Sequence, residues 1–231
     1  MVFDMKKRTA IIAALASILP IGQPLILGTG AALTSAGVIF NMPEEAKAGN
    51  NDFYYNRGVK KYDQGDYYGA IADYTKAIEI NSRDADAYSN RGLAKHNLKN
   101  YYGAISDYTK AIEINPKHQD AFYNRGVSKQ DLQDQYGAIA DYTKAIEINS
   151  RDADAYFNRG LVKHDLKDQY GAIADYTKSI QISPKSDAYL NRSISKEKIG
   201  DINGACLDAK KTINLGNTDS QNEKWVRDNC D

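Results

Sequence analysis

The chain has 231 residues with 30 basic and 30 acidic side chains, so its formal net charge is zero. It therefore lacks the basic excess that is typical of nucleic-acid-binding proteins. Its 42% apolar and 26% charged residues are ordinary for a soluble globular protein, which argues against wholesale disorder. The 17 Tyr, against 5 Phe and 1 Trp, indicate that a small set of residues is reused, as in a repeat protein.

Residues 1–48 differ chemically from the rest of the chain. They contain a basic start at residues 6–8, no charged side chain from Thr9 to Pro43, and an Ala-Lys-Ala sequence at residues 46–48. A basic start, an apolar stretch and small residues before a cleavage point predict a secretory signal peptide. A buried core helix fits this segment poorly, because charged residues return abruptly after it.

An uncleaved membrane anchor is the alternative for the same segment. The apolar stretch is interrupted between Pro20 and Pro24, and neither half clearly reaches the ~20 residues of a spanning helix. Both interpretations predict that residues 49–231 lie outside the cytoplasm, in a periplasm or an equivalent lumen. The protein would be secreted, or anchored by residues 10–40.

Self-comparison of residues 49–217 reveals five consecutive repeats with steps of 34, 34, 34 and 33 residues. A Tyr-x-Asn-Arg-Gly motif or a close variant opens each repeat, and a Gly-Ala-Ile-x-Asp-Tyr-Thr-Lys block follows in the first four. Residues 81–114 and 149–182 are so similar that the duplication runs in units of two repeats. The predicted repeats span residues 51–84, 85–118, 119–152, 153–185 and 186–217.

Each repeat is predicted to form two helices. In the second helix of the second repeat, Ala104, Ile105, Tyr108 and Ala111 follow a 3.6-residue apolar period. An Asp or Asn precedes each second helix and has the chemistry of an N-cap. A glycine lies inside each of the first four first helices, where we expect close approach of the neighbouring helix. The expected N-caps are Asp66, Asn100, Asp134, Asp168 and Asp201.

The 34-residue period resembles the tetratricopeptide repeat (TPR). The resemblance rests on an aromatic residue four places before Gly, and on Ala, Tyr and Ala at fixed positions of the second helix. In the second repeat these are Tyr88, Gly92, Ala104, Tyr108 and Ala111. The resemblance implies an all-α fold, a right-handed solenoid of helix pairs, to which residues 218–231 add a capping helix.

This chain departs from the family pattern at two positions. Arg precedes the glycine position, and Lys follows three residues after it, in all five repeats. Each Arg has an Asp sixteen residues later, which predicts an ion pair between the two helices of a repeat; a basic stripe for an anionic ligand is the alternative. We expect the lysines to extend along the surface with their stems over the aromatic layer, and the alternative is that they face the groove. The predicted pairs are Arg57–Asp73, Arg91–Asp107, Arg125–Asp141 and Arg159–Asp175, with Arg192–Asp208 in the last repeat.

The resemblance also implies a concave groove lined by the first helices. An Asn in each repeat could hold the backbone of an extended peptide, or instead bond to the next helix. Asp residues one turn earlier would favour basic segments, or serve only the helix dipole. The predicted peptide-binding residues are Asn56, Asn90, Asn124, Asn158 and Asn191, with Asp86, Asp120 and Asp154 and the aromatic Tyr55, Tyr123 and Phe157.

Cys206 and Cys230 lie near the C-terminus. In an oxidising compartment they could form a disulfide that joins the capping helix to the array, and otherwise Cys206 would be buried and Cys230 free. The three histidines, His96, His118 and His164, show no metal-binding spacing, and no phosphate-binding loop is present. We therefore expect no metal and no cofactor.

These features predict a non-catalytic scaffold that binds an extended, neutral to basic segment of another protein. The alternative is a structural, self-associating component of the cell envelope. An enzyme would show a cluster of non-repeating polar residues, and the sequence contains none. We expect no nucleic-acid partner, and membrane contact only through the N-terminal segment.

Overall fold

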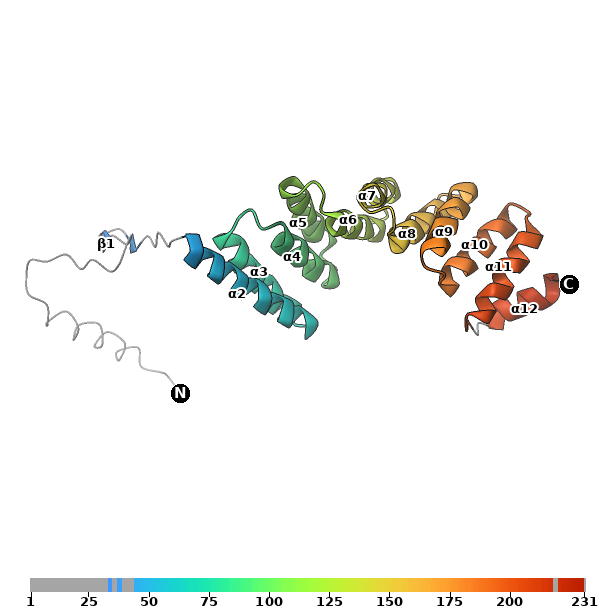
Figure 1. The fold of residues 1–231 in the computed structure, drawn as a ribbon, viewed down its shortest axis with the longest axis horizontal. Coiled ribbons are helices and arrows are strands. Elements are labelled where there is room, and N and C mark those ends of the chain that lie inside the picture. The colour runs from blue at the N-terminus through green and yellow to red at the C-terminus, as the bar shows by residue number, and fades with distance from the viewer. Residues whose placement is uncertain (1–32, 35–36, 39–43, 218–219, 231) are drawn as a thin grey trace, which may run out of the picture. The chain divides into compact units, whose positions relative to one another are not determined.

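The computed structural model describes residues 33–34, 37–38, 44–217 and 220–230 (Figure 1). The chain divides into two units, Met1–Lys47 and Ala48–Asp231. In the first unit, strands β1 (Leu33–Thr34) and β2 (Gly37–Val38) pair antiparallel, with Leu33 opposite Val38. The predicted signal peptide or anchor lies mostly outside the described residues. No helix in the described part of the chain is both long and apolar enough to cross a bilayer.

Eleven helices follow in the described part of the chain, and ten of them form five antiparallel pairs. The second helices of the pairs are α3 (Tyr67–Ile80), α5 (Tyr101–Ile114), α7 (Gln135–Ile148), α9 (Gln169–Ile182) and α11 (Ile202–Asn214). The first helices are α2 (Glu44–Asp63), α4 (Ala85–Asn97), α6 (Gln119–Asp131), α8 (Ala153–Asp165) and α10 (Ser186–Lys198). This architecture confirms the predicted all-α solenoid.

The predicted N-caps of the second helices are confirmed. In α3 the Asp66 carboxylate accepts a hydrogen bond from the amide of Gly69, and Asn100, Asp134, Asp168 and Asp201 repeat this bond. Each cap satisfies a backbone N–H that has no partner within the helix. The caps therefore fix where each second helix begins.

A Tyr from every second helix of the first four repeats fills the core. Tyr74, Tyr108, Tyr142 and Tyr176 are fully buried. The first three cluster with alanines of their own helix and with Ala94, Ala121 or Val162 from the first helix of the next repeat. Each ring lies over the glycine of the first helix in its own repeat, so close that a Cβ at Gly160 would lie 2.7 Å from Cε1 of Tyr176. The close approach expected at these glycines is therefore that of an aromatic ring.

In the last repeat, the contact between the first and second helix is made by different residues. Ser193 occupies the glycine position, and Ala209 occupies the position of the buried Tyr. The hydroxyl of Ser193 donates a hydrogen bond to the carbonyl of Ala205. A larger residue on one helix is thus matched by a smaller one on the other.

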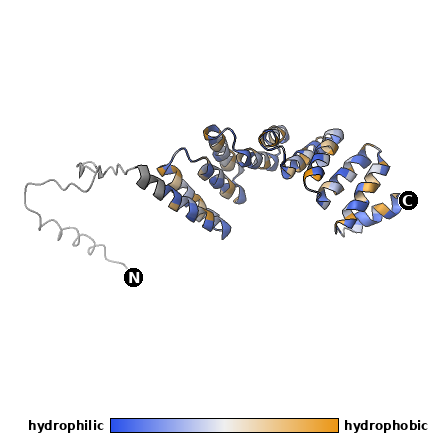
Figure 2. Ribbon diagram, viewed as in Figure 1, coloured by the Kyte–Doolittle hydropathy of each residue, from blue (hydrophilic) through white to orange (hydrophobic). Residues whose placement is uncertain are grey.

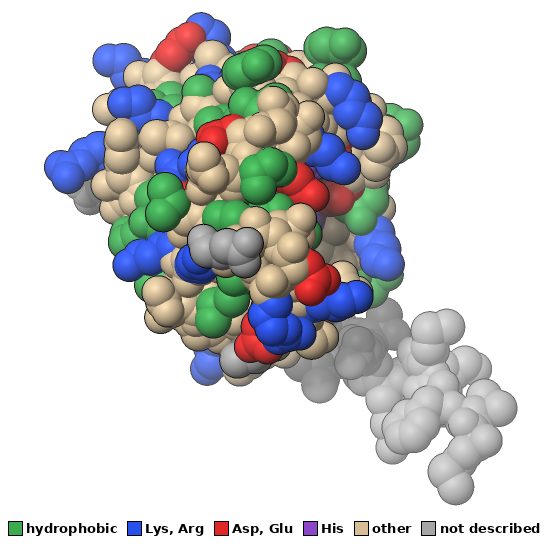
Figure 3. All heavy atoms as spheres, turned by 90° about the vertical axis from the view of Figure 1, so that its right-hand side faces the viewer, with side chains coloured by type: hydrophobic (Ala, Val, Ile, Leu, Met, Phe, Trp, Pro, Cys, Tyr) green, Lys and Arg blue, Asp and Glu red, His purple; other side chains and the backbone are tan. Residues whose placement is uncertain are grey.

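The capping helix is α12 (Ser220–Asn229), which packs on α11. Its Asn222 is buried and donates to the carbonyl of Ala209, while the indole N–H of Trp225 donates to Glu197. Hydrophobic and hydrophilic residues are interspersed along the coloured helices of the array (Figure 2). The C-terminal end carries interspersed basic, acidic and apolar side chains, with no region of a single charge (Figure 3).

Candidate functional site: the inner face of the repeat array

The first helices form the inner face of the array. In the described part of the chain, α4 contacts α6, α6 contacts α8 and α8 contacts α10, whereas the second helices α3, α5, α7, α9 and α11 do not contact one another. Helices on the inside of a curved stack lie closer together than those on the outside. The stack is therefore concave on the side of the first helices.

Four rows of side chains run across this inner face. Within a first helix they stand at positions i, i+4, i+7 and i+11, which share one side of an α-helix. In α6 these are Asp120, Asn124, Val127 and Asp131. In this order along each first helix, we name the rows the Asp row, the Asn row, the aliphatic row and the outer row. The outer row belongs to the inner face and lies nearest the C-terminal end of each helix. The aliphatic row consists of Val59, Leu93, Val127, Leu161 and Ile194.

Members of the Asn row differ in their hydrogen bonds. The amides of Asn90 and Asn158 donate to the hydroxyls of Tyr55 and Tyr123 in the preceding repeat, at 2.8 and 2.7 Å. Asn191 donates to the carbonyl of Asp187 in its own helix. Within the described residues, the side chains of Asn56, which is exposed, and Asn124, which is half-buried, form no hydrogen bond, so both amides are unpaired.

The Asp row shows the same alternation between repeats. His118 Nε2 lies 3.2 Å from Asp86, and Lys185 Nζ lies 2.8 Å from Asp154; each basic residue directly precedes the first helix of the next repeat. Asp120 has no ionic partner in the described part of the chain. A pocket beside the Lys185 contact is lined by Asp154, Phe157 and Asp187. The row thus already binds basic groups of this chain.

The predicted groove aromatics are only partly available to a ligand. The rings of Tyr55, Tyr123 and Phe157 lie 5.8–5.9 Å from the core rings of Tyr74, Tyr142 and Tyr176. All three groove rings are half-buried, and burial raises the pKa of the Tyr55 and Tyr123 hydroxyls. They support the floor of the groove more than they offer free contact area.

The Arg and Asp residues that sequence spacing pairs lie together in all five repeats. In the third repeat, Nε and Nη2 of Arg125 donate to both carboxylate oxygens of Asp141, at 2.9 and 2.7 Å. The remaining Nη1 donates to Thr109 of the preceding repeat. The guanidinium also lies over the ring of Phe122. Each Arg therefore ties two helices of one repeat together and, from the second repeat on, also joins neighbouring repeats.

The lysines form a second contact with the same carboxylates. Lys129 Nζ lies 2.8 Å from Asp141, and the equivalent lysines of the other repeats pair likewise. The expectation of lysines that extend along the surface is wrong, because their side chains are only 18–31% exposed. In the first repeat, the hydrogen bond from Arg57 holds the pKa of Asp73 below its usual value.

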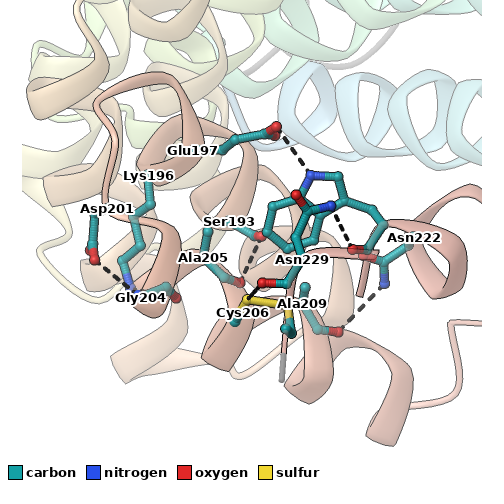
Figure 4. The surroundings of a disulfide bond; sticks show 12 residues. Ser193, Lys196, Glu197, Asp201, Gly204, Ala205, Cys206, Ala209, Asn222 and Asn229 are labelled. Atoms are coloured by element: carbon teal, nitrogen blue, oxygen red, sulfur yellow. Dashed lines mark hydrogen bonds between the residues drawn. A yellow bond between two sulfur atoms is a disulfide. The ribbon is translucent and has the colours of Figure 1, made fainter. Parts of the chain in front are cut away.

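Cys206 of α11 and Cys230, just after α12, are joined by a disulfide (Figure 4). Their Cα atoms are 5.6 Å apart, and 24 residues separate them in sequence. The bond attaches the end of the capping helix to the last repeat. It lies at the C-terminal end of the array, away from the four rows of the inner face.

Sequence reasoning missed the aliphatic row and the lysine contacts. The aliphatic residue follows each Asn by three places, and this spacing recurs in every repeat, so the signal was present. The same spacing also fits a fully buried helix face, and partial exposure on an inner face is visible only once the helices are packed. No group of three or more His, Cys, Asp or Glu side chains within the described residues could hold a metal ion.

Comparison with protein families decides the identity of the array. A family model described as "TPR repeat" matches residues 58–99 and 131–167. Two models described as "Tetratricopeptide repeat" match residues 85–118 and 153–186. The chain is a tetratricopeptide repeat protein. Among curated proteins, none matches the chain.

Solved structures share the TPR fold. A crystal structure of MamA has 25% sequence identity and a TM-score of 0.68, and covers 75% of this chain and 96% of its own. YrrB, described as a TPR protein with an unusual peptide-binding site, has 21% identity and a TM-score of 0.66, over 80% of this chain and 100% of its own. The first TPR of Spaghetti (RPAP3), bound to the HSP90 peptide SRMEEVD, has 26% identity and a TM-score of 0.51, over 52% of this chain and 94% of its own.

These findings place the TPR array among protein-interaction scaffolds. TPR proteins are generally non-catalytic, and their repeats stack so that a long continuous surface is available to a partner. In this TPR protein the inner face is the surface on which polar and apolar rows recur in register.

Proposed function

We propose that this TPR protein is a scaffold that binds an extended, neutral to basic segment of another protein along its inner face. The observation that carries the proposal is the free pair Asp120 and Asn124 at the centre of that face. An unpaired amide can both donate to and accept from a peptide backbone, and the carboxylate favours a nearby Lys or Arg.

A structurally similar TPR domain supports the binding of a peptide, but its peptide has the opposite charge to the one proposed here. The Spaghetti domain was solved with SRMEEVD, which contains three carboxylate side chains. The Asp row of this chain would repel such a segment, because like charges at a groove wall oppose binding. The preferred partner should therefore differ from that acidic peptide in charge.

The location of the protein outside the cytoplasm is part of the proposal. The disulfide between Cys206 and Cys230 supports it, because disulfides persist mainly in oxidising compartments. The charge-free stretch from Thr9 to Pro43 supports export by a signal peptide or an anchor.

A peptide array tests the groove. The full chain would be applied to extended peptides graded in net charge from acidic to basic, as wild type and as Asn124→Ala. We expect binding to increase towards basic peptides, and Asn124→Ala to weaken it about threefold to tenfold, the worth of one hydrogen bond. Its helicity and stability should remain unchanged, because the side chain has no intramolecular partner.

The matched control is Asn203→Ala, the same chemical change at an exposed position of α11. Asn158→Ala is the second comparison, and we expect it to reduce stability because Tyr123 loses a hydrogen bond. Equal binding by wild type and Asn124→Ala, or a preference for acidic peptides, would contradict the proposal.

Self-association is the second candidate function. Four tyrosines in the second helices are 73–77% exposed, at the same position of successive repeats: Tyr68, Tyr102, Tyr136 and Tyr170. One aromatic side chain can bury roughly 150–250 Å². Four of them approach the ~800 Å² that each partner contributes to a specific interface.

If this Tyr row mediates self-association, the molar mass of the full chain should rise with concentration. The variant Tyr102→Gln/Tyr170→Gln should then remain monomeric over the same range. Light scattering after size-exclusion chromatography distinguishes the two. A wild-type chain that stays monomeric throughout would exclude this function.

A further inference from the structure

The four rows of the inner face define a sequence pattern for the bound segment. This inference rests on the proposed function and specifies its ligand. The Asn row lies between the Asp row on one side and the aliphatic row on the other, because the three stand at i, i+4 and i+7 of each first helix. A peptide whose backbone follows the Asn row would therefore lie between two walls of the groove. The Asp row is the charged wall, and the aliphatic row is the apolar wall.

An extended peptide sends successive side chains to opposite sides. When its backbone bonds to Asn124, one set of side chains faces Asp120 and the alternate set faces Val127. We propose that the groove selects segments in which basic and aliphatic residues alternate. A peptide with its charges in one block can satisfy only one wall at a time.

A contact within the protein shows that the charged wall accepts a cation. The ammonium group of Lys185 lies 2.8 Å from Asp154, and the imidazole Nε2 of His118 lies 3.2 Å from Asp86. Both side chains come from outside the groove floor, and the side chains of a ligand would also approach the Asp row from outside the floor. Asp120, in the middle repeat, has no ionic partner in the described part of the chain and is free for a ligand.

The apolar wall is incompletely covered by the protein itself. Ile194 is 36% exposed, and the other four members of the aliphatic row are half-buried. Val59 and Val127 rest on the clusters around Tyr74 and Tyr142 with one side and leave the other side uncovered. An aliphatic side chain from the ligand would remove this remaining apolar area from water, which favours binding.

The outer row strengthens the preference for basic residues. Beyond the aliphatic row lie Asp63, Asp131 and Asp165, all exposed, with Asn97 and Lys198 in the other repeats. The long stems of Lys and Arg can cross apolar surface while their charged ends reach water or a carboxylate. The apolar wall is therefore bordered by carboxylates on its far side as well.

Three peptides of identical composition test the pattern. Each has about 12 residues, half Lys and half Val, and spans about 40 Å when extended. In the first, Lys and Val alternate; in the second, six Lys precede six Val; in the third, Val is spaced for one face of a helix. Binding to the full chain is measured by fluorescence anisotropy. We expect the alternating peptide to bind about tenfold more tightly than the other two.

Variants assign this preference to the aliphatic row. In Leu93→Gln/Leu161→Gln the preference for the alternating peptide should fall from about tenfold to below about threefold. This corresponds to the loss of more than half of the free-energy difference between the peptides. Val127→Thr, which is nearly isosteric, should reduce it without loss of helicity. The matched control is Tyr102→Gln/Tyr170→Gln on the outer side, which should keep the full preference.

The outcomes separate this inference from the proposed function. If all three peptides bind alike and Asn124→Ala weakens each of them, the groove binds peptides but the pattern is wrong. Tighter binding of the helix-spaced peptide would overturn the pattern in favour of a helical ligand. If none of the three peptides binds, or if only the variant Tyr102→Gln/Tyr170→Gln loses binding, both the alternating pattern and the groove as binding site are rejected.

Discussion

Replacement of Asp141 by Ala should lower the free energy of unfolding by about 3–5 kcal/mol, the cost of leaving buried charges without a partner. The Asp141 side chain is 4% exposed and receives three contacts from Arg125 and Lys129. Both cations are themselves mostly buried, at 16% and 21% exposure. After the substitution they would have to remain desolvated and unpaired, or leave the interface between the two helices.

The loss should affect the whole array. Arg125 also bonds to Thr109 in the preceding repeat, so its displacement loosens an interface between repeats. Each repeat is stabilised by its neighbours, so a broken interface spreads through a solenoid. Urea unfolding followed by circular dichroism at the helix band measures the effect. A total stability of about 5–15 kcal/mol is usual, so the change would be a large fraction of it.

Glu147→Ala is the matched control for this experiment. Glu147 pairs with Lys144 at 2.7 Å one turn away on the same helix, but both side chains are more than half exposed. Such a pair is worth about 0.5 kcal/mol or less. Similar losses in the two variants would show that Asp141 is no more important than a surface charge, contrary to this account.

Replacement of Gly160 by Ala should destabilise the array, although Ala is the better helix former. In an exposed helix the change would be favourable by up to ~1 kcal/mol. Here the new Cβ would lie 2.7 Å from Cε1 and 2.9 Å from Cδ1 of Tyr176, whose ring is fully buried. Overpacking of this kind costs about 1–3 kcal/mol, so the clash should reverse the sign.

A double-mutant cycle with Tyr176→Ala isolates the clash. In that background Gly160→Ala should become neutral or stabilising, because the ring that it would strike is gone. The last repeat already contains the analogous combination, Ser193 with Ala209. If Gly160→Ala is equally destabilising with and without the ring, the glycine is required for a reason other than the approach of Tyr176.

Much of the fold was predictable because the repeat supplies the same local signals five times. The apolar period of the second helices, the N-cap residues and the 34-residue step agree with one another, and such consistency across levels specifies a fold. Arg125 and Asp141 could be proposed as partners because their sixteen-residue spacing recurs in every repeat. The part played by Lys129 could not, since a lysine on a helix has the same local pattern whether it is solvated or paired.

The inner face was predictable in position but not in detail. The Asn and Asp rows follow from helical spacing and the family resemblance. The sequence does contain the difference between Asn124 and Asn158, a residue 35 positions earlier: Tyr123 bonds to Asn158, and the buried Ser89 stands in the equivalent place before Asn124. Helical spacing alone does not show that these positions are in contact. That difference arises from contact between repeats.

The sequence by itself determined the number of repeats, the order of helices and the residue types on each face, since these depend on short-range periodicity and on the 34-residue register. Only the tertiary structure decided which polar groups remain free. The hydrogen bonds of Asn90, the cation beside Asp154 and the coverage of Val127 depend on how each repeat sits against the next. Partner availability is a property of packed surfaces, so residues with the same local sequence have different capacities to bind a ligand.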